Sequence, residues 1–299
     1  MKFIGSLTAK QAEILLLSVI MARSTSFMFS KMTLQTMSAF SLLGSRFLLA
    51  FCILCVICFK KLLQLRWKTV ACGAVVGAIY FGVMALEMAG LKTTSTAETS
   101  FLENSAIVIV PLLNAALLRK SPTAAVISSA ATALLGVGFL TLGSGVQGFS
   151  MGKVFCLMAA AMYSIGIITT DRLTRREDPL LIGILQVGFM GFYAFLAALF
   201  TSSWRLPDTP REWGAVLMLA LVCTVFGYTL QPVAQSKVAV EKAGLFCAVS
   251  PSSATVLGAI FLHEQMHPQS YVGVALVLGS ILLPKLWQMH HQHTVPKLA

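Results

Sequence analysis

Residues 179–204 read PLLIGILQVGFMGFYAFLAALFTSSW, a stretch without a single charged side chain. A helix of about 20 apolar residues can cross the hydrocarbon core of a bilayer, so this stretch alone predicts a membrane-spanning helix. Similar charge-free runs recur along the chain, at residues 69–86, 121–152, 154–170, 214–236, 243–263 and 265–284. The chain is therefore expected to cross one membrane repeatedly.

The composition supports this class. Of the 299 residues, 57% are hydrophobic and 11% are charged, whereas roughly a quarter of the residues in a soluble domain are charged. We predict an all-α integral membrane protein with ten transmembrane helices, because Gly, Pro and charge clusters mark the boundaries between them. Arg23 interrupts the first apolar stretch, so we do not expect this stretch to be a cleavable signal. The ten spans are expected near residues 14–32, 40–59, 70–91, 96–118, 124–142, 154–171, 181–200, 214–234, 243–262 and 270–287.

The net charge of +11 could indicate a nucleic-acid partner, but its distribution argues against one. Fifteen of the 22 Lys and Arg residues fall in the tails and loops on one side of the predicted spans, and five fall on the other side. Cytoplasmic loops carry such an excess. We therefore predict a multi-pass protein of the cytoplasmic membrane with both termini in the cytoplasm, surrounded by lipid and without a nucleic-acid partner.

The seven cysteines do not predict a disulfide framework, since their number is odd and all lie inside or at the ends of predicted spans. The spacing Cys52-x-x-Cys55-x-x-Cys58 imitates a cluster-binding motif. On an uninterrupted helix, however, such residues behave as small apolar side chains. Gly73-x-x-x-Gly77 likewise predicts close helix packing rather than a phosphate loop. We predict neither a metal nor a cofactor.

An internal repeat becomes visible when the chain is shifted by 140 residues. Lys31 then falls on Asp171, Arg46 on Gln186 and Pro111 on Pro251. Because five helices per half is an odd number, the second half is expected to sit upside down relative to the first, as in many secondary transporters. The predicted organisation is a first five-helix repeat at 1–147, a second, inverted repeat at 148–288, and a cytoplasmic tail at 289–299.

Four segments carry a resemblance to a known family. They are Ser41-Leu-Leu-Gly-Ser-Arg46-Phe-Leu-Leu-Ala50, Ser100-Phe-Leu with Ile109-Val-Pro111-Leu-Leu, Tyr228-Thr-Leu-Gln231-Pro-Val-Ala-Gln235, and Ala243-Gly-Leu with Ser250-Pro251 and Leu262-His-Glu264. In this order and spacing, the sequence resembles the drug/metabolite transporter superfamily, specifically its EamA-type branch of ten-helix permeases. The resemblance implies two EamA-like repeats, metabolite transport (most simply efflux) and a substrate site between the halves near the bilayer midplane.

The segment His263-Glu264-Gln265-Met266-His267 is a literal H-E-x-x-H motif, which on a helix can hold zinc in a metalloprotease. Pro268 biases His267 away from helical dihedrals, and the remaining histidines belong to the C-terminal tail. An intramembrane metalloprotease therefore stays an alternative, beside a non-transporting scaffold or receptor. We predict that the protein is not an enzyme.

Polar side chains inside membrane spans are costly, so each is a candidate functional residue. Several recur at helical spacing and share one face: Thr224, Tyr228, Gln231 and Gln235; Tyr80 and Glu87; Glu103 and Asn114; Gln186 and Tyr193; Arg23, Ser26 and Ser30. Interhelical hydrogen bonding explains the uncharged ones equally well. For Glu98, which ends the motif Ser95-Thr-Ala-Glu98, we predict a capping role.

Four ionisable residues within the spans are harder to explain as packing: Arg23, Arg46, Glu87 and Glu103. They could pair with one another to latch a closed state, or bind an amino-acid-like zwitterion, and a Glu that releases its proton could couple transport to protons. The predicted substrate-binding residues are Arg23, Tyr80, Glu87, Glu103, Tyr163, Tyr228, Gln231 and Gln235, supported by Arg46, Asn114 and Gln186. Tyr163 is included because the 140-residue shift sets it opposite Arg23.

Overall fold

The computed structural model describes residues 7–94, 99, 102–119, 122–141, 150–250, 253, 269, 271–273 and 275–283. Within these ranges every regular element is a helix. In chain order they are α1 (Ala9–Ser24), α2 (Ser26–Thr33), α3 (Ala39–Ile57), α4 (Phe59–Leu62), α5 (Trp67–Leu91), α7 (Ala106–Leu118), α8 (Ala124–Thr141), α9 (Met151–Thr174), α10 (Pro179–Phe200), α11 (Pro210–Met218), the π-helix η2 (Leu219–Tyr228), α12 (Thr229–Gln235) and α13 (Val240–Phe246). One more apolar helix covers Tyr271–Leu283.

Among the described residues, six stretches are long and apolar enough to cross a membrane: Ala9–Thr33, Ala39–Ile57, Trp67–Leu91, Met151–Thr174, Pro179–Phe200 and Pro210–Gln235. Ala106–Leu117, Ala124–Phe139 and Tyr271–Leu283 are apolar but shorter. Large apolar side chains also lie on the outer surface, such as Trp67, which is 83% exposed, and Phe200, which is 87% exposed. Exposing such side chains to water is unfavourable, so these faces suit contact with lipid.

Short polar side chains begin several helices. Thr8 accepts a hydrogen bond from the backbone N–H of Gln11, whose side chain binds back to the Thr8 N–H, so a capping box starts α1. Asp178 accepts hydrogen bonds from Leu180 and Leu181 and starts α10 just before Pro179. Thr209 starts α11 in the same way. These residues fix where the long apolar segments become helical.

Helix α10 packs against α3, α5 and α12. The close packing predicted for Gly73 and Gly77 is confirmed, since both residues of α5 lie against α10. A Cβ at Gly77 would lie 2.7 Å from the Cβ of Phe189. The two backbones can approach this closely only because these positions carry no side chain.

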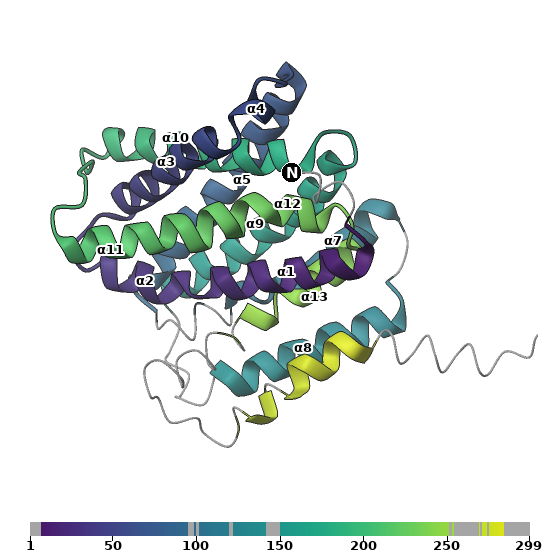
Figure 1. Cartoon of the computed structure of the whole chain (residues 1–299). Helices are drawn as coiled ribbons and strands as arrows, with labels where there is room; N and C mark the ends of the chain where they lie inside the picture. The colour runs from purple at the N-terminus through teal and green to yellow at the C-terminus, as the bar shows by residue number, and fades with distance from the viewer. Residues whose placement is uncertain are drawn as a thin grey trace, which may run out of the picture.

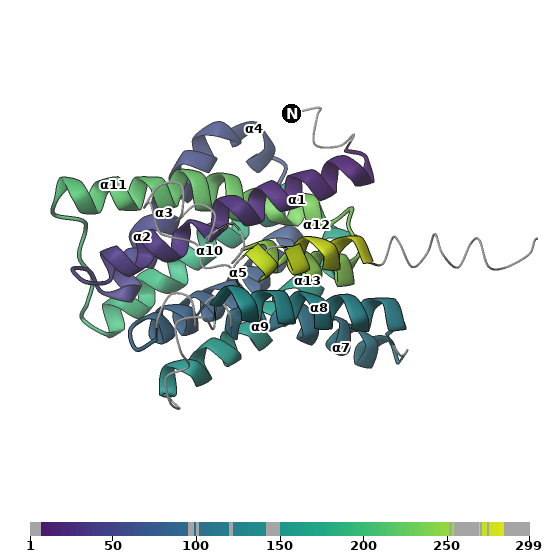
Figure 2. The same ribbon diagram turned by 90° about the horizontal axis from the view of Figure 1, so that it is seen from below.

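Figures 1 and 2 show how the remaining helices are arranged. Helix α1 runs beside η2 and α12, α5 lies along α9, and α7 packs against α9 and α13. At one edge, α8 lies beside the helix at Tyr271–Leu283 in both views. A Cβ at Gly136 of α8 would lie 2.9 Å from the carbonyl oxygen of Gly273, so these two helices touch.

Two helices are less regular than the sequence predicts. The predicted span 14–32 is α1 and α2, which meet at Thr25. There Ser24 Oγ donates to the Met21 carbonyl at 2.7 Å and Thr25 Oγ1 donates to the Ala22 carbonyl at 2.8 Å. Such side-chain bonds to preceding carbonyls compete with the helical ladder. In the predicted span 96–118, the described part turns at residues 104–105 before α7 begins at Ala106.

The predicted span 214–234 contains a ten-residue π-helix, η2, between α11 and α12. Thr224 Oγ1 donates to the carbonyl of Leu219, five residues earlier, at 2.9 Å. Thr229 Oγ1 lies 3.4 Å from the carbonyl of Thr224 with the same spacing. π-helical turns are rare and are found frequently at functional sites. The wider helix changes which residues of this span share one face.

Candidate functional site

The described helices converge on the guanidinium group of Arg23 in α1. Its Nη1 donates to the hydroxyl of Tyr163 at 3.1 Å and to Oε1 of Gln231, and its Nη2 donates to the hydroxyl of Tyr228 at 2.8 Å. These partners come from α9, α12 and η2. One side chain from residues 1–147 thus binds three side chains from residues 148–288.

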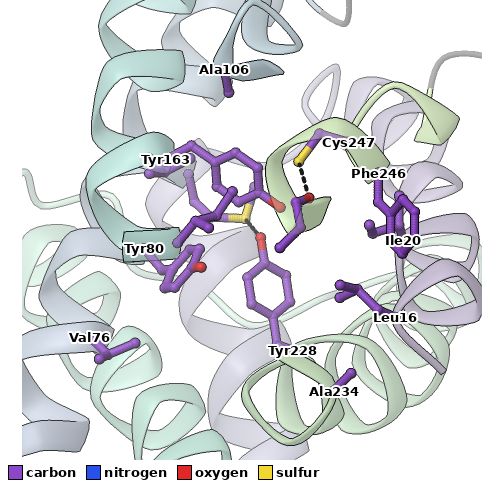
Figure 3. Packing of buried hydrophobic residues seen from close by; sticks show 14 of the residues in the cluster. Leu16, Ile20, Val76, Tyr80, Ala106, Tyr163, Tyr228, Ala234, Phe246 and Cys247 are labelled. Atoms are coloured by element: carbon purple, nitrogen blue, oxygen red, sulfur yellow. Dashed lines mark hydrogen bonds between the residues drawn. The ribbon is translucent and has the colours of Figure 1, made fainter. Parts of the chain in front are cut away.

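Aromatic rings surround this guanidinium. Its central carbon lies 4.0 Å from the ring centre of Tyr228 and 5.4 Å from that of Tyr163, which are cation–π distances. Tyr80 of α5 packs edge-on against both rings, with centres 5.8 Å from Tyr163 and 6.0 Å from Tyr228. Figure 3 shows the three tyrosines turned toward one another. We call Arg23, Tyr80, Tyr163, Tyr228 and Gln231 the Arg23 cluster.

Two further contacts complete the Arg23 cluster. Gln231 Nε2 donates to the hydroxyl of Tyr80 at 3.1 Å, so one amide joins Arg23 to Tyr80. The hydroxyl of Tyr228 donates to the sulfur of Met84 at 3.1 Å. Charge-assisted hydrogen bonds and cation–π contacts together hold the guanidinium in one orientation.

A glycine makes room for Arg23. A Cβ at Gly227 of η2 would lie 2.7 Å from Cγ of Arg23, closer than side-chain carbons pack. The aliphatic part of the Arg23 side chain therefore packs against η2 at Gly227, which has no side chain. This close approach lets the guanidinium reach Tyr228 and Gln231 on the same helix.

Beside the Arg23 cluster lies the central cavity, of about 40 Å³. Arg23, Glu87, Glu103, Tyr163 and Tyr228 line it together with Ser26, Phe27, Asn104, Cys247 and Ser250. A single water needs roughly 10 to 15 Å³ of such volume, so this cavity has room for a few waters. Sites for small-molecule ligands usually measure about 300 Å³ or more. In this conformation the cavity is therefore smaller than a metabolite.

Both carboxylates of the central cavity are buried, with 3% of Glu87 and 8% of Glu103 exposed. Glu87 Oε1 and Glu103 Oε2 have no hydrogen-bond partner. No direct ion pair joins either carboxylate to Arg23 or Arg46, although all four residues are described. The mutual pairing left open by the sequence is thus not present in this conformation.

Arg46 of α3 lies next to the Arg23 cluster and does not line the cavity. It is fully buried, and its Nε donates to Thr224 Oγ1 of η2 at 2.8 Å. Its Nη1 and Nη2 have no hydrogen-bond partner. The guanidinium carbon lies 5.8 Å from the ring centre of Tyr228. Arg46 therefore contacts the helix that carries Tyr228 rather than the cavity itself.

Gln186 of α10 contacts the same helix. Its Nε2 donates to the backbone carbonyl of Tyr228 at 2.5 Å, which helps to satisfy the backbone where η2 passes into α12. Gly183, one turn earlier, faces the backbone carbonyl of Thr229 so closely that a Cβ would clash. Helix α10 thus holds the η2–α12 junction with one amide and one glycine.

Two predicted residues lie away from the cavity. Asn114 of α7 donates to Glu241 of α13 at 2.5 Å. Gln235 is buried at the end of α12, and its Oε1 has no partner. The other residues predicted to bind substrate all belong to the Arg23 cluster or to the cavity lining. Gln235 therefore completes the polar face of α12 but not the described cavity.

Sequence reasoning missed several residues at this site, among them Met84, Asn104 and Cys247. Asn104 follows Glu103 directly, so a polar pair inside a predicted span was a usable signal. Met84 and Cys247 resemble ordinary core residues, and the sequence gives no sign of their place. The H-E-x-x-H motif, Glu98 and the tail histidines lie outside the described residues. In the part of the chain that is described, no three His, Cys, Asp or Glu side chains gather to form a metal site.

Known proteins resemble this chain over most of its length. The sequence profile of the EamA-like transporter family matches residues 10–142 and again residues 150–284. YetK of Bacillus subtilis, described as an uncharacterized transporter, is 26% identical over 295 residues, which cover 93% of this chain and 88% of YetK. YwfM of the same organism, also described as an uncharacterized transporter, is 28% identical over 222 residues, which cover 73% of each chain.

Two further similarities are more distant: one covers about half of the chain, and the other concerns the fold alone. A biotin transporter of Salmonella typhimurium is 24% identical over 168 residues, which cover 53% of this chain and 54% of that protein. One solved structure, 19% identical, superposes with a TM-score of 0.76 over 94% of this chain and 98% of its own. At this identity the superposition demonstrates a shared fold only.

Proposed function

The chain belongs to the EamA-like transporter family, and from this premise we propose a secondary transporter that exports a small, polar, amino-acid-like metabolite through the cytoplasmic membrane. The observation that carries the proposal is the central cavity, where one arginine and two carboxylates meet inside an apolar bundle. Ionisable groups at such depth are costly and usually serve a ligand or ion pathway. We propose no enzymatic activity.

The location of the cavity supports alternating access. Residues from 1–147 and from 148–288 both line it, and the Arg23 cluster joins the two parts. Transporters built from two repeats commonly bind substrate at such an interface and expose it by moving one part against the other. A cavity of about 40 Å³ then corresponds to a closed conformation. Opening must separate some of the contacts around Arg23.

For the whole chain we propose ten transmembrane helices in two inverted repeats, 1–147 and 148–288, followed by a cytoplasmic tail, 289–299. The two separate matches to the family, at 10–142 and 150–284, support a repeated unit. The distribution of Lys and Arg supports cytoplasmic termini. Reporter fusions should be cytoplasmic near residues 64, 120, 175 and 238 and external near residues 36, 146, 208 and 266. A cytoplasmic reporter near residue 266 would contradict the inverted repeat.

The decisive experiment is a screen of candidate metabolites with purified protein in sealed proteoliposomes. We expect counterflow of at least one small polar metabolite and no counterflow in liposomes without protein. Replacing Arg23 with Gln should abolish it, whereas replacing Arg211, which lies outside the cavity lining, should not. Failure to move any metabolite would favour a scaffold or receptor instead. Bound zinc with proteolysis that Glu264→Gln abolishes would favour the metalloprotease.

A further inference from the structure

The central cavity contains two acceptors without donors. Glu87 reaches it from α5 and Glu103 from just before the turn that precedes α7. Both side chains are more than nine-tenths buried, and Glu87 Oε1 and Glu103 Oε2 accept no hydrogen bond. A buried carboxylate oxygen without a donor is strongly unfavourable. These two oxygens therefore lack a donor, which a ligand can supply.

Arg23 does not supply this donor. Its guanidinium is directed to the side chains of Tyr163, Tyr228 and Gln231, all of which are uncharged acceptors. It forms no ion pair with Glu87 or Glu103. The Nε–H and one N–H of Nη2 form no hydrogen bond within the described part of the chain, but a ligand carboxylate that binds them would also approach two acidic side chains. A ligand cation meets one positive charge, that of Arg23, and two carboxylates.

We propose that the central cavity binds the protonated amine of the substrate between Glu87 and Glu103, and that this amine, rather than a carboxylate, is the group required for recognition. The inference rests on the proposed transport function, because it assigns the substrate class of the same site. Amines with or without a carboxylate belong to this class. Anions without an amine do not.

The dimensions of the cavity fit this assignment. An ammonium group is close to a water molecule in size and carries up to three N–H donors, enough to reach both carboxylates and one further acceptor. Hydrogen bonds between an ammonium and a carboxylate are charge-assisted and stronger than neutral ones. The remainder of the ligand needs the additional volume that opening creates.

Cys247 offers a reporter of occupancy, because its side chain lines the same cavity and is 4% exposed. The test uses a variant in which the other six cysteines are alanine, treated with the small neutral reagent methyl methanethiosulfonate. Three probes of equal chain length are compared at neutral pH: butylammonium, butyrate and butanol. The melting temperature of the unmodified protein with each probe is a second, independent readout.

We expect saturating butylammonium to slow modification of Cys247 about tenfold and to raise the melting temperature, while butyrate and butanol change neither. The double variant Glu87→Gln, Glu103→Gln should lose both effects. Glu177→Gln should keep both, because Glu177 binds Thr69 outside the cavity lining. Equal protection by butyrate, or protection that survives in the double variant, would overturn the inference. The absence of both effects would also overturn it, since two protonated carboxylic acids without affinity for amines would give that result.

These binding readouts are separate from transport. Protection by butylammonium together with a failure to move any amine or other metabolite in proteoliposomes would refute the transporter and leave the amine site standing. Counterflow of metabolites that carry no amine, without protection by butylammonium, would refute the amine site and leave the transporter standing.

Discussion

At the scale of single residues, the site depends on one arginine whose hydrogen-bonding capacity is shared among uncharged partners. Arg23 binds two tyrosine hydroxyls and one amide, and two tyrosine rings flank its charge. The two carboxylates nearby remain without such partners. The fold therefore holds the charged arginine by polar contacts and leaves the acids available to a ligand or a proton.

The close contact between Gly227 and Arg23 gives a first prediction. Gly227→Ala places a Cβ 2.7 Å from Arg23 Cγ, so Arg23 must move and lose its contacts with Tyr228 and Gln231. We expect destabilisation by about 1 to 3 kcal/mol and a strong loss of counterflow, measured by thermal melting and in proteoliposomes. Gly214→Ala is the matched control, because nothing lies within 4 Å of its Cβ. Equal behaviour of the two variants would contradict this role for Gly227.

The carboxylates give a second prediction. If one of Glu87 and Glu103 carries a coupling proton and the other suffices to bind the amine, the Gln variant of the first should fold and exchange substrate but fail to accumulate it against a concentration gradient when driven by a pH gradient. The amide keeps the size of the side chain and cannot release a proton at that position. The measurement compares counterflow with pH-driven uptake for each variant. Normal pH-driven accumulation in both variants would exclude proton coupling through these residues.

At the scale of secondary structure, the distinctive element is the π-helix η2. The hydroxyls of Thr224 and Thr229 each donate to the backbone carbonyl of the residue five positions earlier. Two neighbouring helices hold it, through Arg46 of α3 on Thr224 and Gln186 of α10 on the carbonyl of Tyr228. The α-helical spacing used in the sequence analysis therefore describes this span only approximately, because π turns contain more residues.

The start of α10 gives a third prediction. Partial burial alone would raise the pKa of Asp178, but the hydrogen bond from Lys61 and those from the Leu180 and Leu181 amides lower this pKa below its ordinary value. A group with a lowered folded-state pKa adds stability above its unfolded-state pKa, about 3.9, and loses it as the pH falls through the folded-state value. This contribution is complete at neutral pH and absent in strong acid.

Asp178→Asn removes this titration but keeps a good N-cap side chain. We expect a loss of up to about 1 kcal/mol at neutral pH, since the Lys61–Asp178 pair is about one-third exposed. The difference in melting temperature between the two proteins should shrink as the pH falls below about 4. Asp178→Ala, which also removes the cap, should be less stable than Asp178→Asn at every pH. A difference that does not depend on pH would refute the ionic contribution.

At the scale of the whole molecule, polar contacts near the predicted cytoplasmic ends of the helices join the two halves. Lys242 of α13 pairs with Glu13 of α1, and Asn114 of α7 donates to Glu241 of α13. Thr69 of α5 donates to Glu177 at 2.6 Å. Helix α13 is thus tied to both α1 and α7 near their predicted cytoplasmic ends.

The contact between α1 and α13 gives a fourth prediction. If it stabilises the closed conformation, Glu13→Lys should repel Lys242, leave folding nearly unchanged, since exposed pairs contribute about 0 to 1 kcal/mol, and alter the counterflow rate. The exchange Glu13→Lys with Lys242→Glu should restore the original rate. Both effects should weaken at high salt, because exposed charges are screened. A charge-exchanged protein that resembles the single variant would exclude a direct pair.

The sequence by itself determined the class of protein, the family and the identity of most polar residues near the cavity. Hydropathy and helical spacing are local properties, because lipid requires every spanning segment to satisfy its own backbone hydrogen bonds within the helix. The family follows from motifs that lie in short stretches of the chain. Arg23, Glu87, Glu103 and the tyrosines were identifiable because polar side chains are rare in such stretches.

Only the tertiary structure decided which of these residues meet. The partners of Arg23 lie 140, 205 and 208 positions away in the sequence, so their contacts depend on how four helices pack. The same packing separates Asn114 from the cavity, brings Met84 and Cys247 to it, and widens η2 into a π-helix. Side-chain fit between helices depends on the volumes of many residues at once, including glycines such as Gly227 and Gly183. That information is distributed over the whole chain and is not present in any single segment.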